Sequence, residues 1–126
     1  MELKIENLEV TLQKNKILNR VSLTVKSGVL ISLLGASGCG KSTLAGCING
    51  LNPFSNPGEC TGSLTVDGVD APNSSIFELA DHVGTVLQDP DGQFIGLTVA
   101  EDIAFALENS CTPQKEMHET TRRVAE

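Results

Sequence analysis

The chain has 126 residues, of which 40% are apolar and 20% are charged, and its formal net charge is −7. This composition is typical of a folded protein rather than a disordered one. The apolar stretch of residues 29–34, interrupted only by Ser32, is too short to cross a bilayer, and the first ten residues show no signal-peptide pattern, so we expect a cytoplasmic chain. Residues 63–126 contain three Lys/Arg and twelve Asp/Glu, and this excess of negative charge argues against a nucleic-acid partner.

The strand patterns come in two kinds. Residues 3–12 and 17–25 alternate apolar with polar positions around the polar turn 13–16, which predicts an antiparallel ribbon. Residues 29–34 and 83–88 are almost entirely apolar, as in strands of a parallel sheet that is covered on both faces. Residues 52–62 contain two prolines and two glycines and are predicted to be a loop, followed by a short strand at 63–66 that Asp67–Gly68 closes.

Helix signals occur at four places. A helix is expected to start at Lys41 and to end at Asn49–Gly50, and a second short one covers residues 74–82. Thr98 and Glu101 have the spacing of a capping box, which opens a helix to about residue 108, and Pro113 opens another that runs to residue 126. The four cysteines lie far apart without CxxC spacing, so we expect ordinary reduced thiols.

The most informative stretch is GASGCGKST, residues 35–43. Gly35, Gly40, Lys41 and Ser42 satisfy the pattern G-x-x-x-x-G-K-[ST], placed between an apolar strand pattern and a predicted helix. Glycines let the backbone N–H groups approach anionic oxygens at the N-terminus of a helix, where the dipole favours negative charge. The expected nucleotide contacts are Gly35, Ala36, Ser37, Gly38, Cys39, Gly40, Lys41, Ser42 and Thr43.

Within this loop, three side chains have expected roles. Lys41 reaches the β and γ phosphates and is a candidate catalytic residue, the Ser42 hydroxyl ligates Mg²⁺, and Thr43 lies near the α phosphate. The pattern therefore predicts a bound nucleoside triphosphate with Mg²⁺. Small-molecule kinases, small GTPases and motor ATPases share this loop, so the loop alone does not choose among them.

Three further stretches carry a resemblance to a family. IENLEVTL…ILNRVSLTVKSG, INGLNP…GSLTVDGVD and VGTVLQDPDGQFIGLTVAEDIAFALEN resemble the ATP-binding subunit of ABC transporters, and the QDPDGQF version is most similar to the energy-coupling-factor branch. The resemblance implies an α/β P-loop NTPase fold: an incomplete RecA-like core with an N-terminal antiparallel β-subdomain and the start of a helical subdomain. The corresponding division is 1–28 for the ribbon, 29–97 for the partial core and 98–126 for the helical part.

The same resemblance implies roles for residues outside the loop. Gln88 matches the Q-loop glutamine, which would touch Mg²⁺ or the attacking water as a catalytic residue. Leu12 matches the position that usually stacks an aromatic ring on adenine, and leucine lacks that stacking contribution of about 1 kcal/mol. Phe94, Ile95 and Phe105 are expected to form an apolar surface for a transmembrane subunit, although Phe105 fits a core position equally well. Asp89 and Asp91 are expected to shape a turn.

The implied ligands are thus ATP and Mg²⁺. The implied partners are a transmembrane transporter subunit and a second ATP-binding subunit. The implied activity is ATP hydrolysis that energises import of a vitamin or metal ion, by a protein bound peripherally to the inner face of the cell membrane.

Some parts of the family pattern are missing from this sequence. It contains no LSGGQ-like signature, no apolar strand pattern ending in Asp-Glu and no later switch histidine. Because phosphoryl transfer depends on positioning and electrostatic stabilisation, we expect hydrolysis only within a complete subunit, of which this chain is the N-terminal portion. We also expect exposed apolar surface on residues 29–34 and 83–87. Two alternatives remain at this level: a non-catalytic fragment that docks on a transporter or partner ATPase, and an unrelated P-loop small-molecule kinase.

Overall fold

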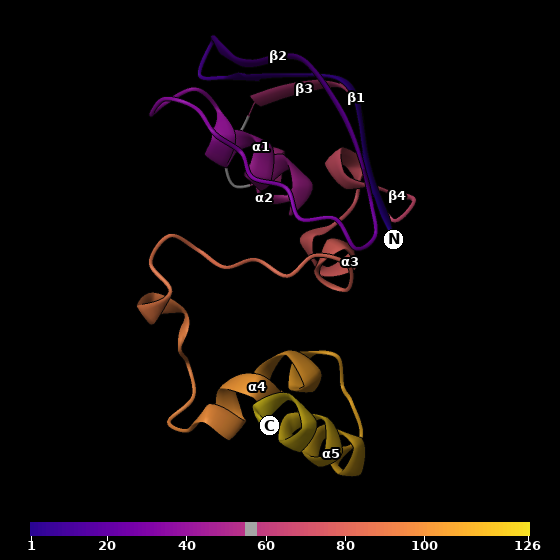
Figure 1. Ribbon diagram of the computed structural model, residues 1–126, viewed down its shortest axis with the longest axis vertical. Helices are drawn as coiled ribbons and strands as arrows, with labels where there is room; N and C mark the ends of the chain where they lie inside the picture. The colour runs from indigo at the N-terminus through magenta and orange to yellow at the C-terminus, as the bar shows by residue number, and fades with distance from the viewer. Residues whose placement is uncertain (55–57) are drawn as a thin grey trace. The chain divides into compact units, whose positions relative to one another are not determined.

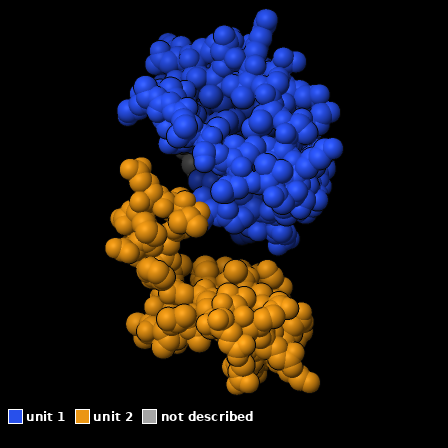
Figure 2. Space-filling model, in the orientation of Figure 1, with its two compact units in different colours: residues 1–85 blue, residues 86–126 orange. Residues whose placement is uncertain are grey.

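A computed structural model of the chain describes residues 1–54 and 58–126 and separates into two compact units, Met1–Thr85 and Val86–Glu126 (Figure 2). The first unit contains β1 (Glu2–Leu12), β2 (Asn15–Lys26), α1 (Lys41–Ile48), α2 (Leu51–Phe54), β3 (Gly58–Val66), β4 (Val69–Asp70), η1 (Ala71–Asn73) and α3 (Ile76–Ala80) (Figure 1). The second contains η2 (Asp91–Gln93), α4 (Val99–Asn109) and α5 (Gln114–Ala125).

The first unit is built on a four-stranded antiparallel sheet with the order β2-β1-β3-β4. The predicted ribbon is confirmed, since β1 and β2 pair antiparallel from Glu2↔Lys26 to Leu12↔Asn15. The predicted loop at 52–62 is wrong in its second part, because β3 begins at Gly58 rather than at residue 63. Gly58 permits this close pairing, because a Cβ there would collide with the carbonyl oxygen of Thr11.

A β-bulge interrupts β1 where the alternation of the sequence is irregular. The register shifts between Ile5 and Leu8 against β2, and Asn7 adopts a left-handed conformation with φ 50. A bulge inserts an extra residue and turns the following side chain to the same face. As a result, Ile5 and Leu8 are both buried in the core although they are three residues apart.

The core of this unit lies between the sheet and the helices that cover one of its faces (Figure 1). Strand residues Leu18, Leu64 and Val66 join Ile5, Leu8 and Val10 there, and Leu44 and Cys47 come from α1, with Ala71 and Leu79 completing the cluster. Helix α1 is fixed against the sheet because Leu44 and Cys47 are buried in this core.

Helix α3 is shorter than the predicted helix 74–82. The Ser75 side chain caps it by accepting a hydrogen bond from the Glu78 N–H.

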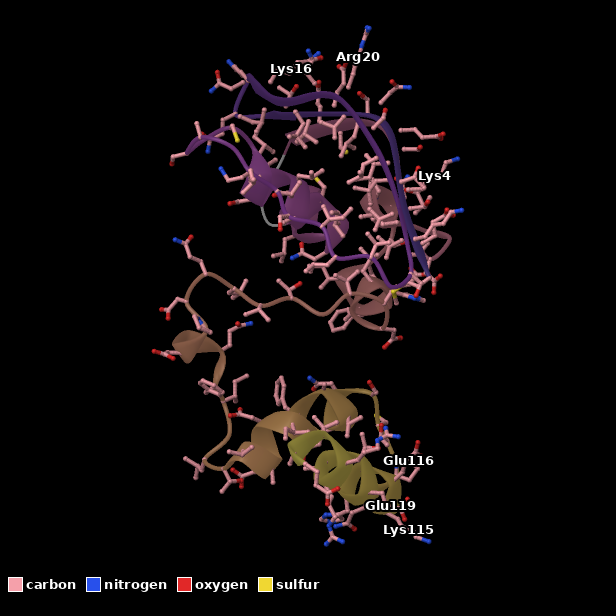
Figure 3. All side chains as sticks on the ribbon, viewed as in Figure 1. Lys4, Lys16, Arg20, Lys115, Glu116 and Glu119 are labelled. Atoms are coloured by element: carbon pink, nitrogen blue, oxygen red, sulfur yellow. The ribbon has the colours of Figure 1, made fainter. Side chains whose placement is uncertain are left out.

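The opposite face of the sheet carries charged side chains. Glu9 accepts hydrogen bonds from Lys16 (Nζ–Oε2 2.7 Å) and from Arg20 (Nε–Oε1 3.2 Å), both on β2 (Figure 3). These partners, Lys16 first, hold the pKa of Glu9 below its usual value. The cross-strand cluster identifies this face as the solvated one.

Two strand predictions need correction. Residues 29–34 and 83–88 belong to no strand, and most of their apolar side chains are exposed: 95% for Leu30, 93% for Leu34 and 84% for Val86. Val83 is the exception, because it is partly buried against the core. A strand exists only where a neighbour accepts and donates its ladder hydrogen bonds. Among residues 1–54 and 58–126 the only sheet is the antiparallel one, which offers these segments no parallel partner. The expected exposure of apolar surface is confirmed.

The second unit is a pair of helices preceded by a turn-rich segment. Helix α4 opens with the capping box that the sequence predicts: Thr98 Oγ1 accepts from the Glu101 N–H, and the Glu101 carboxylate accepts from the Thr98 N–H. Helix α5 follows Pro113, also as predicted, and packs against α4. Cys111, with φ 53, provides the reversal between them.

Candidate phosphate-binding site

The loop of residues 35–40 runs directly into α1. Gly38 and Gly40 have φ values of 79 and 99, in the left-handed region that glycine adopts without strain. Gly40 also approaches β2 closely, because a Cβ at this position would lie 2.9 Å from Leu18 Cδ2 and 3.3 Å from the Ile17 carbonyl oxygen. The first N–H groups of a helix have no intrahelical acceptor, and no side chain caps α1 at Gly40. The start of α1 thus presents N–H donors that suit an anion.

The Lys41 side chain folds back into the loop. Its ammonium group donates hydrogen bonds to the carbonyl oxygens of Gly35 (2.9 Å) and Ala36 (2.7 Å), and lies 3.6 Å from Cys39 Sγ. The loop carbonyls therefore hold the cation at the centre of the turn while the side chain remains half-buried. An ammonium group has three donors, and the third of Lys41 reaches only the weak acceptor Cys39 Sγ, so it can turn to a phosphate oxygen.

These residues enclose a hollow of about 190 Å³. Its lining consists of Ile17, Gly38, Gly40, Lys41, Ser42 and Thr43. The motif gave no reason to include Ile17, which comes from β2. The sequence signal that could have found it is the ribbon pattern, since the strand that follows the 13–16 turn passes beside the loop through Ile17 and Leu18.

Ser42 lines the hollow from the exposed first turn of α1, and its hydroxyl is a candidate oxygen ligand there. In the part of the chain that the structure describes, no three His, Cys, Asp or Glu side chains gather as a metal site would require. Mg²⁺ prefers oxygen ligands and is commonly held by one or two protein oxygens together with substrate phosphates and water. A single hydroxyl beside a phosphate loop fits that mode of binding.

Leu12 lies elsewhere in the first unit. It pairs with Asn15 and Gly58 at the end of β1, and its side chain packs against the core and lines a small internal gap with Val10 and Cys47. The hollow beside the loop is bordered on the β2 side by Ile17 instead. A role of Leu12 against adenine stays a prediction.

Gln88 belongs to the second unit, where it is exposed and opens the bend 88–90. The Leu87 N–H donates to Gln93 Oε1 (2.9 Å), which closes the segment between them into a compact turn. Asp91 begins the single turn η2 behind Pro90, the turn-forming position expected for it. The roles of Gln88 as a catalytic and Mg²⁺-binding residue stay predictions.

A larger cavity, of about 810 Å³, lies in the second unit. It runs between the first turn of α4 and the face of α5, and its lining includes Val99, Lys115, His118 and Arg122. This groove has no glycine-rich loop and mixes cations with the carboxylates of Glu119 and Glu126. The smaller hollow at the loop is the better candidate for a triphosphate because its donors converge.

Comparison with known proteins agrees with this geometry. Residues 18–126 match the family model of the ABC transporter. The chain belongs to the ABC transporter family. It is 51% identical over 125 residues to an ABC transporter ATP-binding protein of Clostridium perfringens, covering 99% of this chain and 22% of that protein. A second ABC transporter ATP-binding protein, from Enterococcus faecalis, is 52% identical over 114 residues, covering 90% of this chain and 20% of that protein.

A solved structure of the family is also similar. The ABC protein cbiO1 from Clostridium perfringens, part of the transporter complex cbiONQ, superposes with a TM-score of 0.75 at 29% identity, covering 93% of this chain and 46% of that one. The expected fold class, the N-terminal portion of a P-loop NTPase of the ABC type, is thereby confirmed, as is the resemblance to the energy-coupling-factor branch. This ABC chain spans about a fifth of the length of the curated relatives it matches. None of its described helices combines the length and the apolarity that a membrane span requires.

Proposed function

We propose that the loop of residues 35–43 binds the triphosphate of ATP together with Mg²⁺, as part of an ABC ATPase that energises transport. The observation that carries this proposal is the position of Lys41, whose ammonium group is held by the Gly35 and Ala36 carbonyls at the open N-terminus of α1. A fixed cation beside free N–H donors is the arrangement that stabilises a polyphosphate. Family membership supports ATP as the nucleotide.

In this proposal, the Ser42 hydroxyl would hold Mg²⁺, and the ion would neutralise charge on the phosphates. The catalytic and Mg²⁺-binding role of Gln88 is proposed from the family resemblance alone. Ile17 contacts the nucleotide from β2, and Leu12 covers the base by apolar contact alone. Lys41 holds the β and γ phosphates in place for attack by water. Because several parts of the family's catalytic pattern are missing from this sequence, hydrolysis takes place in the complete subunit.

The proposed partners are a second ATP-binding subunit and a transmembrane subunit, which would hold the protein at the inner face of the membrane. The similarity to cbiO1, a part of the ABC transporter complex cbiONQ, supports assembly into a multi-subunit transporter. The exposed Phe94 and Ile95 (69% and 65%) are the proposed contact with the membrane subunit, together with Phe105. Vitamins and metal ions are the proposed class of cargo. The division of the chain into a ribbon (1–28), a partial core (29–97) and a helical part (98–126) remains part of the same proposal.

Titration of the chain with ATP in the presence of Mg²⁺ tests the binding site. Lys41→Ala removes a charged hydrogen-bond donor, worth about 1.5–3 kcal/mol, so ATP should bind about 10- to 150-fold more weakly. Lys26→Ala is the matched control, because it deletes the same charge from an exposed position at the end of β2. Equal affinity of wild type and Lys41→Ala, with both variants folded by circular dichroism, would refute the proposed site.

A further inference from the structure

Residues 95–98, which lead into α4, have their backbone N–H groups bound by side chains. Asp102 Oδ1 accepts hydrogen bonds from the N–H groups of Ile95 (2.9 Å) and Gly96 (2.8 Å). Glu101 Oε2 accepts from the N–H groups of Leu97 (2.7 Å) and Thr98 (3.0 Å). Four consecutive backbone donors are thus bound by two adjacent carboxylates on the first turn of α4.

The glycine in this segment is required by the same arrangement. A Cβ on Gly96 would lie 2.7 Å from Glu101 Cβ and 2.8 Å from the Asp102 backbone nitrogen, closer than packed atoms approach. Hydrogen bonds to a carboxylate are stronger than neutral ones, and negative charge is favourable at a helix N-terminus. The segment is therefore folded tightly onto α4.

The side chains of this segment point the other way. Phe94, Ile95 and Leu97 are 69%, 65% and 97% exposed, although each is large and apolar. An exposed apolar segment of this kind would ordinarily be mobile, and ordering it on contact with a partner would reduce affinity. Here the two carboxylates already hold the backbone in place before a partner binds. Little conformational entropy is then lost on binding.

We propose that Asp102 and Glu101 are positioning residues that hold residues 95–98 against α4, so that Phe94, Ile95 and Leu97 form a preorganised contact for the membrane subunit. This inference rests on the proposed function for the identity of the partner. The clamp itself depends only on contacts within the second unit. Neither carboxylate touches nucleotide or substrate in this scheme, because both are engaged with backbone N–H groups.

Three variants of the full-length protein in its transporter complex separate the possibilities. Asp102→Ala removes the acceptor for two N–H groups, Asp102→Asn keeps an acceptor oxygen but removes the charge, and Glu108→Ala deletes an exposed carboxylate from the same helix as a control. Hydrogen exchange at the Ile95 and Gly96 amides should accelerate about tenfold or more in Asp102→Ala. It should accelerate less in Asp102→Asn and not at all in Glu108→Ala.

The functional readout is ATP hydrolysis with and without the membrane subunit. Asp102→Ala should lower the stimulation by the membrane subunit about tenfold and leave the affinity for ATP unchanged, with partial recovery in Asp102→Asn. Gly96→Ala, which displaces the same segment by steric contact, should reproduce the loss.

Unchanged exchange at both amides in Asp102→Ala would overturn the clamp, and faster exchange with unchanged stimulation would overturn its positioning role. Loss of stimulation accompanied by weaker ATP binding would also contradict it, because the defect would then lie in the nucleotide site. A wild-type protein that binds no ATP would instead overturn the proposed function, while the exchange measurement would still decide whether the clamp exists.

Discussion

Replacement of Gly40 by alanine provides a strict test of how the loop is fitted against β2. Gly40 has φ 99, and an alanine there incurs about 1–2 kcal/mol for the left-handed conformation. The added Cβ would also lie 2.9 Å from the buried Leu18 side chain and 3.3 Å from the Ile17 carbonyl oxygen, and such overpacking costs about 1–3 kcal/mol more. We therefore expect a total destabilisation of about 2–5 kcal/mol.

Gly28→Ala is the matched control for the backbone contribution. Gly28 has φ 80, in the same region, but a Cβ there meets nothing within 4 Å. It should cost only about 1–2 kcal/mol. In urea unfolding followed by circular dichroism, an m-value of about 1–3 kcal/mol per molar predicts a midpoint for Gly40→Ala lower than that of Gly28→Ala by about 1 M. Equal midpoints would refute the argument that β2 constrains the loop sterically.

Three further predictions concern stability. Lys14 is the second left-handed residue of the β1–β2 turn (φ 67). Lys14→Gly should relieve backbone strain and stabilise the chain by about 0.5–1 kcal/mol, measured as a higher Tm. An unchanged Tm would argue against strain at this position. Leu64→Ala, at a fully buried site, should cost about 2–5 kcal/mol in urea unfolding, whereas Leu30→Ala, 95% exposed, should stay within about 0.5 kcal/mol; similar costs would contradict the assigned core. Burial, with a smaller contribution from Cys60, raises the pKa of Cys47 from 9.0 to about 11. The unfolded chain then loses this proton at lower pH, so stability should be constant below pH 9 and fall towards pH 11, and a Cys47→Ala variant with the same fall would disprove the cause.

The sequence predicted well those elements whose partners are close along the chain. The ribbon of residues 3–25, the helix that starts at Lys41 and the Thr98–Glu101 cap all depend on neighbours within a few residues or one turn. Local pattern is sufficient in such cases because the interaction that stabilises the element is encoded beside it.

The failures arose where a distant partner decides the structure. Residues 58–62 resemble a loop in composition, yet they form a strand because β1 supplies a ladder and because Gly58 permits close approach to Thr11. Residues 29–34 have the composition of a buried strand but lack a neighbour within the described residues. The loop motif alone did not identify Ile17 as a lining residue, because its place there depends on how β2 packs beside the loop.

The central position of β1 has a consequence for the order of events during synthesis. Its first neighbour, β2, follows at once, but its second, β3, pairs Val66 with Leu3 across more than sixty positions. At about 5–20 residues per second, a ribosome needs about 2–8 s to progress from Lys26 to Val66. The nascent hairpin spends that interval with one edge of β1 open, so this edge is where a chaperone would protect the emerging chain and where two neighbouring nascent chains would first mispair.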